Sequence, residues 1–296
     1  MPEGDAVWRA ARRLHEALAG ERLVGADLRV PRLATADLRG RGTLEVVPRG
    51  KHLLHRIEGD LTLHSHLRME GRWRVLRASR PPSSTGRHTV RALLWTADRV
   101  AVGDQLGMLD LVRTSEEHRV VGHLGPDLLD PAFDRDLALA NIRRDPRLTI
   151  TEALLDQRNL AGIGTIFASE PLFLHGIQPW RTVRDVGPEA VAELVDTARR
   201  LLVLSCRAGR TTVTGRTEMG DDTWVHGQVG LPCRRCGNTI RLAPVGAPPR
   251  ERVLSYCPTC QRGLAPTDDG ARQSPLGHAR PDYSGGDYSR RWDRAR

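Results

Sequence analysis

Lysine is almost absent from this sequence. Of its 45 lysine and arginine residues 44 are arginine, and Lys51 is the single lysine. Codon bias in a GC-rich genome is the simplest cause of the general loss, and it makes the one position that kept lysine unusual. Lysine offers a compact ammonium that can shift its pKa and transfer protons, whereas arginine stays charged. We therefore favour a chemical role for Lys51 over chance survival.

Aromatic residues, long apolar runs and cysteines are also scarce. Aromatic residues make up 4% of the chain, and no uncharged apolar run approaches the length that spans a bilayer. The first residues are charged and have no apolar core, which argues against a signal peptide or membrane anchor. Four of the five cysteines form two tight pairs, which fits an intracellular metal site better than a disulfide framework. We expect a cytoplasmic protein with no membrane partner.

What the chain has in excess is positive charge. The formal net charge is +9, and 39% hydrophobic residues over 296 positions allow a real core and two domains. A basic soluble protein suggests an anionic partner, of which nucleic acid is the commonest. Charge alone does not choose among DNA, RNA and an acidic surface.

The apolar pattern predicts an α+β protein. Helical spacing predicts a first helix over residues 3–20, and then the pattern changes to short apolar segments separated by turn residues. Eight such segments imply a β-sandwich or barrel over residues 1–125. The predicted strands are residues 22–30, 43–49, 52–57, 61–66, 72–76, 90–96, 100–103 and 108–112.

The second half of the chain is predicted to be helical and then cysteine-rich. Residues 126–225 form a helical domain with predicted helices at 134–142, 149–157, 166–175 and 188–206. A compact cysteine-rich module covers residues 226–262. Residues 263–296 are rich in Pro, Gly, Asp and Arg with little apolar content, which predicts a disordered tail.

The two cysteine pairs predict a metal site. Cys233, Cys236, Cys257 and Cys260 have the C-x2-C spacing, twice, that is typical of one zinc ion held by four thiolates. The alternative is two structural disulfides. Four thiolates leave no open coordination position, so the zinc is expected to be structural. The segment between the pairs carries Arg241, Arg250 and Arg252, which either face a phosphate backbone or are simply solvated.

Two further stretches raise chemical questions. "MPEGD" at residues 1–5 places Pro2 where removal of Met1 exposes a secondary amine, but on these residues alone Pro2 more simply starts a helix. "NLAGIG" at 159–164 lies between two predicted helices, where Gly162 and Gly164 could present N–H groups to a phosphate. Equally, these glycines only turn the chain, and Asn159 either contacts phosphate or caps the turn.

"MPEGD", "RGKHLL" at 49–54, "GIG" at 162–164 and the two cysteine pairs together resemble the formamidopyrimidine-DNA glycosylase and endonuclease VIII family of base-excision repair enzymes. The resemblance spans nearly the whole chain before residue 263. It implies a helix and eight-strand β-sandwich, a helix-two-turn-helix domain and a zinc finger, with damaged DNA in the cleft between. We expect a monomer acting on DNA in a bacterial cytoplasm.

The resemblance also implies roles for individual residues. Pro2 matches the family nucleophile, Glu3 the acid and base that protonates the opening sugar, and Lys51 the lysine that contacts DNA phosphate. Arg252 matches the finger arginine beside the lesion. "SHLRMEG" at 65–71 aligns with the loop that fills the hole left by the flipped nucleotide, so Met69 is either a wedge or a core residue.

Two positions depart from the family pattern. Thr165 stands where the family has asparagine directly after "GIG", and Ala6 replaces a second early glutamate. Thr165 still offers a hydroxyl to the turn, but the grip on phosphate there is less certain. Ala6 puts the assisting role of the lost carboxylate in doubt.

The implied activity is that of a bifunctional DNA glycosylase and abasic-site lyase that removes oxidised bases through a Pro2 Schiff base with β,δ-elimination. The start of the chain and the short hairpin before residue 74 favour the endonuclease VIII branch and oxidised pyrimidines. Two alternatives stay open: a glycosylase for oxidised purines, and a non-catalytic zinc-finger protein that binds damaged DNA.

Overall fold

The computed structural model describes residues 2–79, 86–218, 220–249 and 251–273, and the chain divides into two units, Met1–Phe133 and Asp134–Arg296. Residues 126–133, the first part of the predicted helical domain, lie in unit 1, where the Asp127 carboxylate accepts a hydrogen bond of 2.6 Å from the Gly50 N–H.

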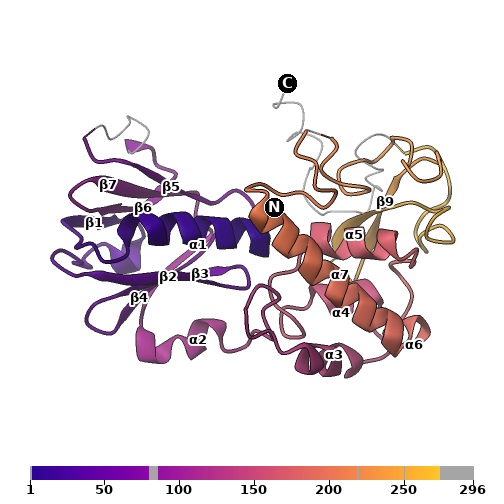
Figure 1. Cartoon of the computed structure of the whole chain (residues 1–296), viewed down its shortest axis with the longest axis horizontal. Helices are drawn as coiled ribbons and strands as arrows, with labels where there is room; N and C mark the ends of the chain where they lie inside the picture. The colour runs from indigo at the N-terminus through magenta and orange to yellow at the C-terminus, as the bar shows by residue number, and fades with distance from the viewer. Residues whose placement is uncertain (1, 80–85, 219, 250, 274–296) are drawn as a thin grey trace. The chain divides into compact units, whose positions relative to one another are not determined.

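Unit 1 is a sandwich of two four-stranded antiparallel sheets with one long helix, α1 (Gly4–Leu18). The eight predicted strands are all present, within a few residues of their expected ends (Figure 1). The first sheet has the order β1-β6-β7-β5 and the second β2-β3-β4-β8. The strands are β1 (Gly25–Leu28), β2 (Thr43–Arg49), β3 (His52–Ile57), β4 (Leu61–His66), β5 (Arg72–Arg77), β6 (Val90–Trp95), β7 (Arg99–Asp104) and β8 (Met108–Arg113).

The core of unit 1 lies between the sheets and under α1. The helix packs on β2 and β5, each of which is one of the two edge strands of its sheet. Val7, Leu14 and Leu18 are buried at helical spacing, while Leu53 and Ile57 of β3 face the same cluster. Because side chains alternate across a strand, the odd-numbered residues of β3 face this core and the even-numbered ones the outer face of the sheet.

Unit 2 begins with a helical part. Its helices are α3 (Arg135–Arg143), α4 (Ile150–Leu155), α5 (Thr165–Leu174), α6 (Val183–Val186) and α7 (Pro188–Arg207). The four predicted helices are present, and sequence supports their starts: Asp134 caps α3, and Thr149 with Glu152 forms a capping box at α4. The four-residue helices α2 (His118–Val121) and α6 were not predicted, because one turn has no readable period.

The cysteine-rich module carries a two-stranded hairpin, β9 (Arg241–Val245) paired with β10 (Arg252–Tyr256). It packs directly on the helical part of unit 2, since Phe173 of α5 shares a buried cluster with Val225, Cys233, Ile240 and Cys257. Glu170 of α5 is fully buried and accepts hydrogen bonds from three consecutive N–H groups, those of residues 224–226, at 2.8 to 3.0 Å. This carboxylate ties the approach to the module to α5.

The first part of the predicted tail is folded. Asp268 is bonded to the guanidinium of Arg241 and to the Tyr256 hydroxyl, and the side-chain amide of Gln273 pairs with both main-chain groups of Leu242 at 2.8 Å. Residues 263–273 therefore extend the cysteine-rich module, held by long-range contacts that composition does not reveal. Residues 274–296, the rest of the predicted tail, lie outside the described residues.

Among the residues that the structure describes, no helix is long and apolar enough to cross a membrane.

Candidate functional site

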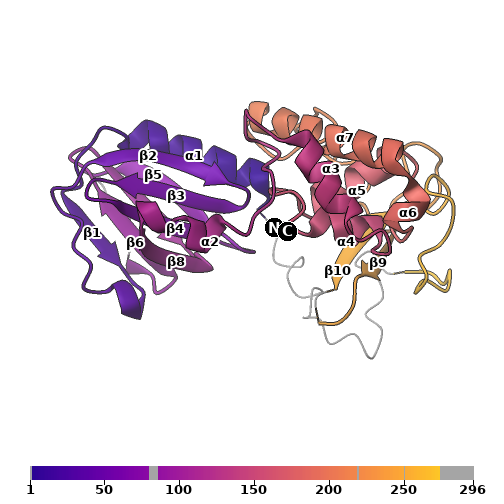
Figure 2. The ribbon, with the colours of Figure 1, turned by 90° about the horizontal axis from the view of Figure 1, so that it is seen from below.

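The first candidate residues stand at the start of α1. Pro2 is partly exposed, whereas Glu3 is only 1% exposed, and the Glu3 carbonyl accepts the N–H groups of Ala6 and Val7 at 3.0 and 3.1 Å. Glu3 therefore occupies the N-cap position, in extended backbone, and its carboxyl group is kept from bulk water. Figures 1 and 2 show that the start of α1 and the β2–β3 turn lie at the same end of unit 1.

Lys51 lies in that β2–β3 turn, and buried polar groups fix the turn. Gly50 has φ +57°, a conformation that favours glycine, and its N–H donates to Asp127 Oδ2 at 2.6 Å. Asp127 Oδ1 accepts the Leu129 N–H at 2.9 Å. Burial raises the pKa of Asp127 despite these donors. The turn that carries Lys51 is thus held in place by the Asp127 carboxylate.

Met69 lies in a tight loop between β4 and β5. Its side chain is 44% exposed, so it is not the core residue that was one of the two alternatives. The loop is sharply bent: Arg68 has φ +53°, and a Cβ on Gly71 would come within 2.3 Å of the Leu67 carbonyl oxygen. An exposed apolar side chain on a constrained loop is compatible with the wedge, which stays a prediction.

The glycine turn before α5 is organised by Gln157. Its amide nitrogen donates to the Ile163 carbonyl at 2.9 Å, and its oxygen accepts the Gly162 N–H at 3.1 Å. Gly162 has φ +99°, which favours glycine. The Gly162 N–H is used within the turn in this way, Gly164 is the N-cap of α5, and Thr165 is its first residue. A phosphate contact at this helix N-terminus stays a prediction.

Asn159 turns inward rather than toward a ligand. It is 8% exposed, and its amide donates to the Ala153 carbonyl at 2.9 Å. Asn141 in turn donates to the Asn159 carbonyl at 3.3 Å. The predicted phosphate contact at Asn159 is therefore replaced by the other alternative, closure of the turn.

The four paired cysteines come together as predicted. Their sulfur atoms all lie within 4.8 Å of one another, with Sγ–Sγ distances of 3.5 Å for Cys236 and Cys257 and 3.9 Å for Cys233 and Cys260. Four thiolates at about 2.3 Å around a tetrahedral ion are separated by roughly 3.8 Å. Without an ion, the Asn238 N–H lowers the pKa of Cys236, while burial raises the pKa values of Cys257 and Cys260. Metal binding to these thiols would therefore release protons. The cluster can hold one metal ion.

The arginines of the module differ in availability. Arg252, at the start of β10, is exposed. Arg241 is 9% exposed and forms a buried ion pair with Asp268, so the predicted phosphate contact at Arg241 is wrong. Arg250 lies outside the described residues.

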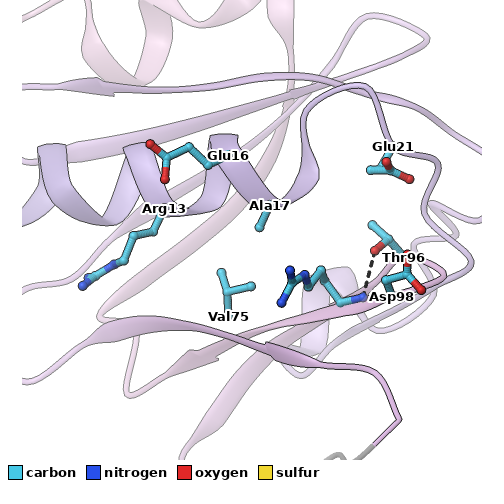
Figure 3. Close-up of a pocket in the computed structure, with 8 residues that line it drawn as sticks. Arg13, Glu16, Ala17, Glu21, Val75, Thr96 and Asp98 are labelled. Atoms are coloured by element: carbon cyan, nitrogen blue, oxygen red, sulfur yellow. Dashed lines mark hydrogen bonds between the residues drawn. The ribbon is translucent and has the colours of Figure 1, made fainter.

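A cleft of about 540 Å³ lies at the other end of α1, against β5 and the β6–β7 turn (Figure 3). Arg13, Glu16, Glu21, Asp98 and Arg99 give it charges of both signs, and none of the predicted site residues lines it. It is therefore not part of the candidate site.

The sequence analysis did not identify the polar residues that hold the turns next to the predicted site residues. Asp127, Gln157 and Glu170 each satisfy two or three hydrogen-bonding groups of a turn. Asp127 stands in "GPDLLDP" at residues 125–131, at the predicted boundary between residues 1–125 and 126–225. Glu170 gave a clearer signal, because a carboxylate among the apolar neighbours of α5 needs a partner.

Two family models match the sequence. The formamidopyrimidine-DNA glycosylase N-terminal domain matches residues 1–109, and the formamidopyrimidine-DNA glycosylase H2TH domain matches residues 124–217.

Curated relatives match over nearly their whole lengths. The probable endonuclease 8 2 of Streptomyces coelicolor is 52% identical, covering 91% of this chain and 97% of its own. The DNA-(apurinic or apyrimidinic site) lyase Nei2 of Mycolicibacterium smegmatis is 41% identical, with 88% and 99% covered. The formamidopyrimidine-DNA glycosylase of Gluconobacter oxydans is 32% identical, with 88% and 100% covered.

The fold is also similar to that of solved structures. Lactococcus lactis formamidopyrimidine-DNA glycosylase in complex with DNA that contains N7-benzyl-Fapy-dG is 25% identical, with a TM-score of 0.75. The same enzyme with DNA containing an oxidised pyrimidine is 26% identical, also with a TM-score of 0.75. Both comparisons cover 88% of this chain and all of the other. With these matches in both halves and the fold described above, this chain belongs to the formamidopyrimidine-DNA glycosylase and endonuclease VIII family.

Proposed function

We propose that this protein is a DNA glycosylase and abasic-site lyase of base excision repair that uses the Pro2 amine as its nucleophile. One observation carries the assignment of residues: the start of α1, with Pro2 and the buried Glu3, lies at the same end of unit 1 as the anchored Lys51 turn. Membership of the family supports the reaction class.

The amine of Pro2, exposed once Met1 is removed, suits the chemistry. An α-amine has a reference pKa of about 7.7 to 8.0, so roughly a tenth is neutral at pH 7, against less than about 0.1% of an ordinary lysine. Its nitrogen attacks the sugar C1′ while the bond from C1′ to the damaged base breaks, and the base leaves with a proton. Glu3 protonates the ring oxygen as the sugar opens.

The iminium that follows carries the lyase step. A secondary amine can form only a cationic iminium with the C1′ aldehyde carbon, and this cation accepts the electrons released when a proton leaves C2′. The 3′-phosphate is then expelled, and loss of the 5′-phosphate completes β,δ-elimination. Hydrolysis of the remaining conjugate returns the amine.

Four regions are proposed to hold the DNA. Lys51 contacts a phosphate next to the reacting sugar, Met69 fills the space left by the flipped nucleotide, and Arg252 contacts the backbone. The N-terminus of α5, at Gly164 and Thr165, binds a further phosphate with its N–H groups. The four cysteines hold one zinc ion, a donor set for which structural zinc is typical, and the ion stabilises the module that carries Arg252.

We favour oxidised pyrimidines as substrates, because the relatives named endonuclease 8 share 52% and 42% identity with this chain, against 32% for the formamidopyrimidine-DNA glycosylase of Gluconobacter oxydans. We further propose that the protein acts as a monomer in the cytoplasm. Light scattering with and without DNA tests the oligomeric state.

Borohydride trapping tests the nucleophile. Borohydride added during reaction with abasic-site DNA reduces the iminium, and we expect one covalent adduct that peptide mapping places at Pro2. An extra residue before Pro2 converts the amine to an amide and should abolish both trapping and base release. Lys51 is the single competing side-chain amine, so an adduct at Lys51 would show that the nucleophile is misassigned.

Two controls separate the alternatives. Glu3→Gln should slow base release while a ready-made abasic aldehyde is still trapped. Duplexes that each carry one oxidised pyrimidine or purine rank the substrates. Tight binding of these duplexes with neither base release nor strand scission would instead favour the non-catalytic damage binder.

A further inference from the structure

A row of histidines leads from the outer face of the second sheet to Lys51. Strand register puts His52 of β3 opposite His66 of β4, and His64 of β4 opposite Asp110 of β8. Residues that alternate with them, such as Leu53 and Leu63, face the core. These polar side chains therefore lie together on the outer face of the sheet, and His52, the first residue of β3, places the row next to the β2–β3 turn.

The members of this row are in contact. His52 Nδ1 lies 2.8 Å from His64 Nε2, and the two rings stack with centroids 5.1 Å apart. On its other side His64 Nδ1 lies 3.5 Å from Asp110 Oδ2, which is an electrostatic contact longer than a hydrogen bond. The His64 side chain is fully buried. We call Asp110, His64 and His52 the histidine relay.

The carboxylate sets the direction of the relay. A proton on His64 Nδ1 faces the negative Asp110, so in the neutral ring His64 Nε2 is an acceptor. His52 must then donate through Nδ1, which leaves a lone pair on His52 Nε2. The Asp110 carboxylate, with only His64 between it and His52, thus fixes an acceptor on the residue that directly follows Lys51.

The charges around the relay are mixed. His66 on β4, His123 beyond α2 and Lys51 in the turn act on His52; Glu117 acts on His64, Arg68 on His66, and Arg32 pairs with Asp110. Burial is the main cause that lowers the pKa of His52 to about 3 and that of His66 to about 4, and the positive charge of Lys51 adds to it. In the absence of DNA the imidazoles of His52 and His64 are therefore neutral at physiological pH.

A phosphate bound at Lys51 weakens the positive field that Lys51 exerts on His52 and His66. Its negative charge offsets the ammonium and favours a cation on the adjacent imidazole. We propose that the histidine relay takes up a proton from solvent when a DNA phosphate binds at Lys51, so that DNA binding and protonation are coupled. The proton adds to the lone pair of His52 Nε2, no other bond changes, and Asp110 stabilises the cation through His64. This inference rests on the proposed DNA contact at Lys51.

Calorimetry measures the coupling directly. The full-length protein is titrated with a duplex that contains a tetrahydrofuran abasic analogue, at constant salt between pH 5 and 7, in buffers of different ionisation enthalpy. The dependence of the binding heat on the buffer gives the number of protons taken up. We expect uptake by the wild type, so that half a proton makes binding about threefold tighter for each unit that the pH falls.

Asp110→Asn keeps the shape of the side chain but removes its charge, so proton uptake and the gain in affinity at low pH should both be lost. Asp27→Asn in β1 changes the net charge equally, on the other sheet, and should behave as the wild type. The His52→Gln side chain cannot be protonated, so this variant should show the same loss of proton uptake as Asp110→Asn. Agreement between the two variants argues against a folding defect in one of them as the cause. Asp110→Glu should restore part of the uptake.

The outcomes distinguish this inference from the function on which it rests. Equal proton uptake by the wild type, Asp110→Asn and His52→Gln would overturn the relay while leaving DNA binding intact. If Lys51→Ala binds the same duplex as tightly as the wild type, the proposed phosphate contact at Lys51 is wrong, and the coupling proposed for the histidine relay is wrong as well. Nitrogen chemical shifts that place the His64 proton on Nε2 would also contradict the relay.

Discussion

In unit 1 a buried carboxylate supports the turn that carries Lys51, whereas in unit 2 two of the candidate polar residues, Asn159 and Arg241, form hydrogen bonds inside the fold. Asp127 holds the main chain beneath Lys51 and leaves the lysine side chain partly exposed. Asn159 and Arg241, by contrast, are buried against internal partners. Internal hydrogen bonds thus leave the candidate side chain accessible in unit 1 and bury the candidate side chains in unit 2.

This difference predicts that substitutions in the two units impair the protein in different ways. Damage to unit 2 should act through stability and grip on DNA, and damage at the start of α1 should act on the reaction itself. The following three experiments test this division, from the largest expected effect to the smallest.

The largest effect is expected from loss of the metal. Structural zinc contributes about 10 kcal/mol or more to the folding of isolated finger peptides, so Cys233→Ser or chelation should unfold the cysteine-rich module. Metal analysis should find about one zinc per chain in the wild type. Hydrogen exchange should rise in residues 225–273 and stay low in the strands of unit 1.

Borohydride trapping is the functional control for that experiment. At saturating abasic-site DNA the metal-free protein should still form the Pro2 adduct, because the reacting groups belong to unit 1. If the metal-free protein formed no Pro2 adduct while the amides of unit 1 stayed protected from hydrogen exchange, the reaction would depend on unit 2 as well, and the proposed division of roles would be wrong.

A smaller effect is expected from Arg241→Ala, with Arg252→Ala as its matched partner. Arg241→Ala leaves the buried Asp268 carboxylate unpaired, which costs about 3 to 5 kcal/mol of unfolding free energy. Arg252 is exposed, so Arg252→Ala should change stability by less than about 0.5 kcal/mol. It should instead weaken DNA binding and reduce the slope of log K against log salt by about 1. Urea unfolding measures the stability of both variants, and DNA binding at several salt concentrations measures the slope. Equal losses of stability in Arg241→Ala and Arg252→Ala would contradict the structural role given to Arg241.

The smallest effect concerns pH. Burial raises the pKa of Glu170 to about 7 from 4.5, although three N–H donors favour the carboxylate. Since the folded state holds the proton more tightly, this group stabilises the fold below pH 4.5 and loses that contribution as the pH rises through 7. The slope is at most about 1.4 kcal/mol per pH unit. Urea unfolding between pH 4.5 and 7 should show it in the wild type.

Glu170→Gln should be less stable at each pH, because the amide cannot accept all three N–H groups, but it should lack this slope. Glu189→Gln, at the exposed start of α7, should keep it. A slope that persists in Glu170→Gln would assign the titration to another group.

Local sequence signals predicted the elements whose causes are local. The eight strands were found because turn residues separate short apolar segments, and the long helices because their apolar residues repeat every three or four positions. Spacing alone also predicted the cysteine cluster, since each C-x2-C turn is self-contained. The start of α1 followed from Pro2 and the acidic residues after it.

The rest depended on partners far away in the sequence. Residues 263–273 are ordered by Arg241 and Leu242. The sequence left two alternatives open for Asn159, because its acceptor, the Ala153 carbonyl, depends on how the turn closes. Asp127 and Gly50 are 77 positions apart. No composition or period encodes such pairs, whereas a buried carboxylate such as Glu170 at least signals that some partner exists.

The single lysine has a practical consequence. A protease that cuts only after lysine has one site in this chain, in the short turn between β2 and β3. Because that turn is fixed by the Asp127 carboxylate, cutting requires the hairpin end to open. The rate at which two fragments appear therefore reports the local opening of this hairpin, and protection by an added oligonucleotide would give its occupancy without any label.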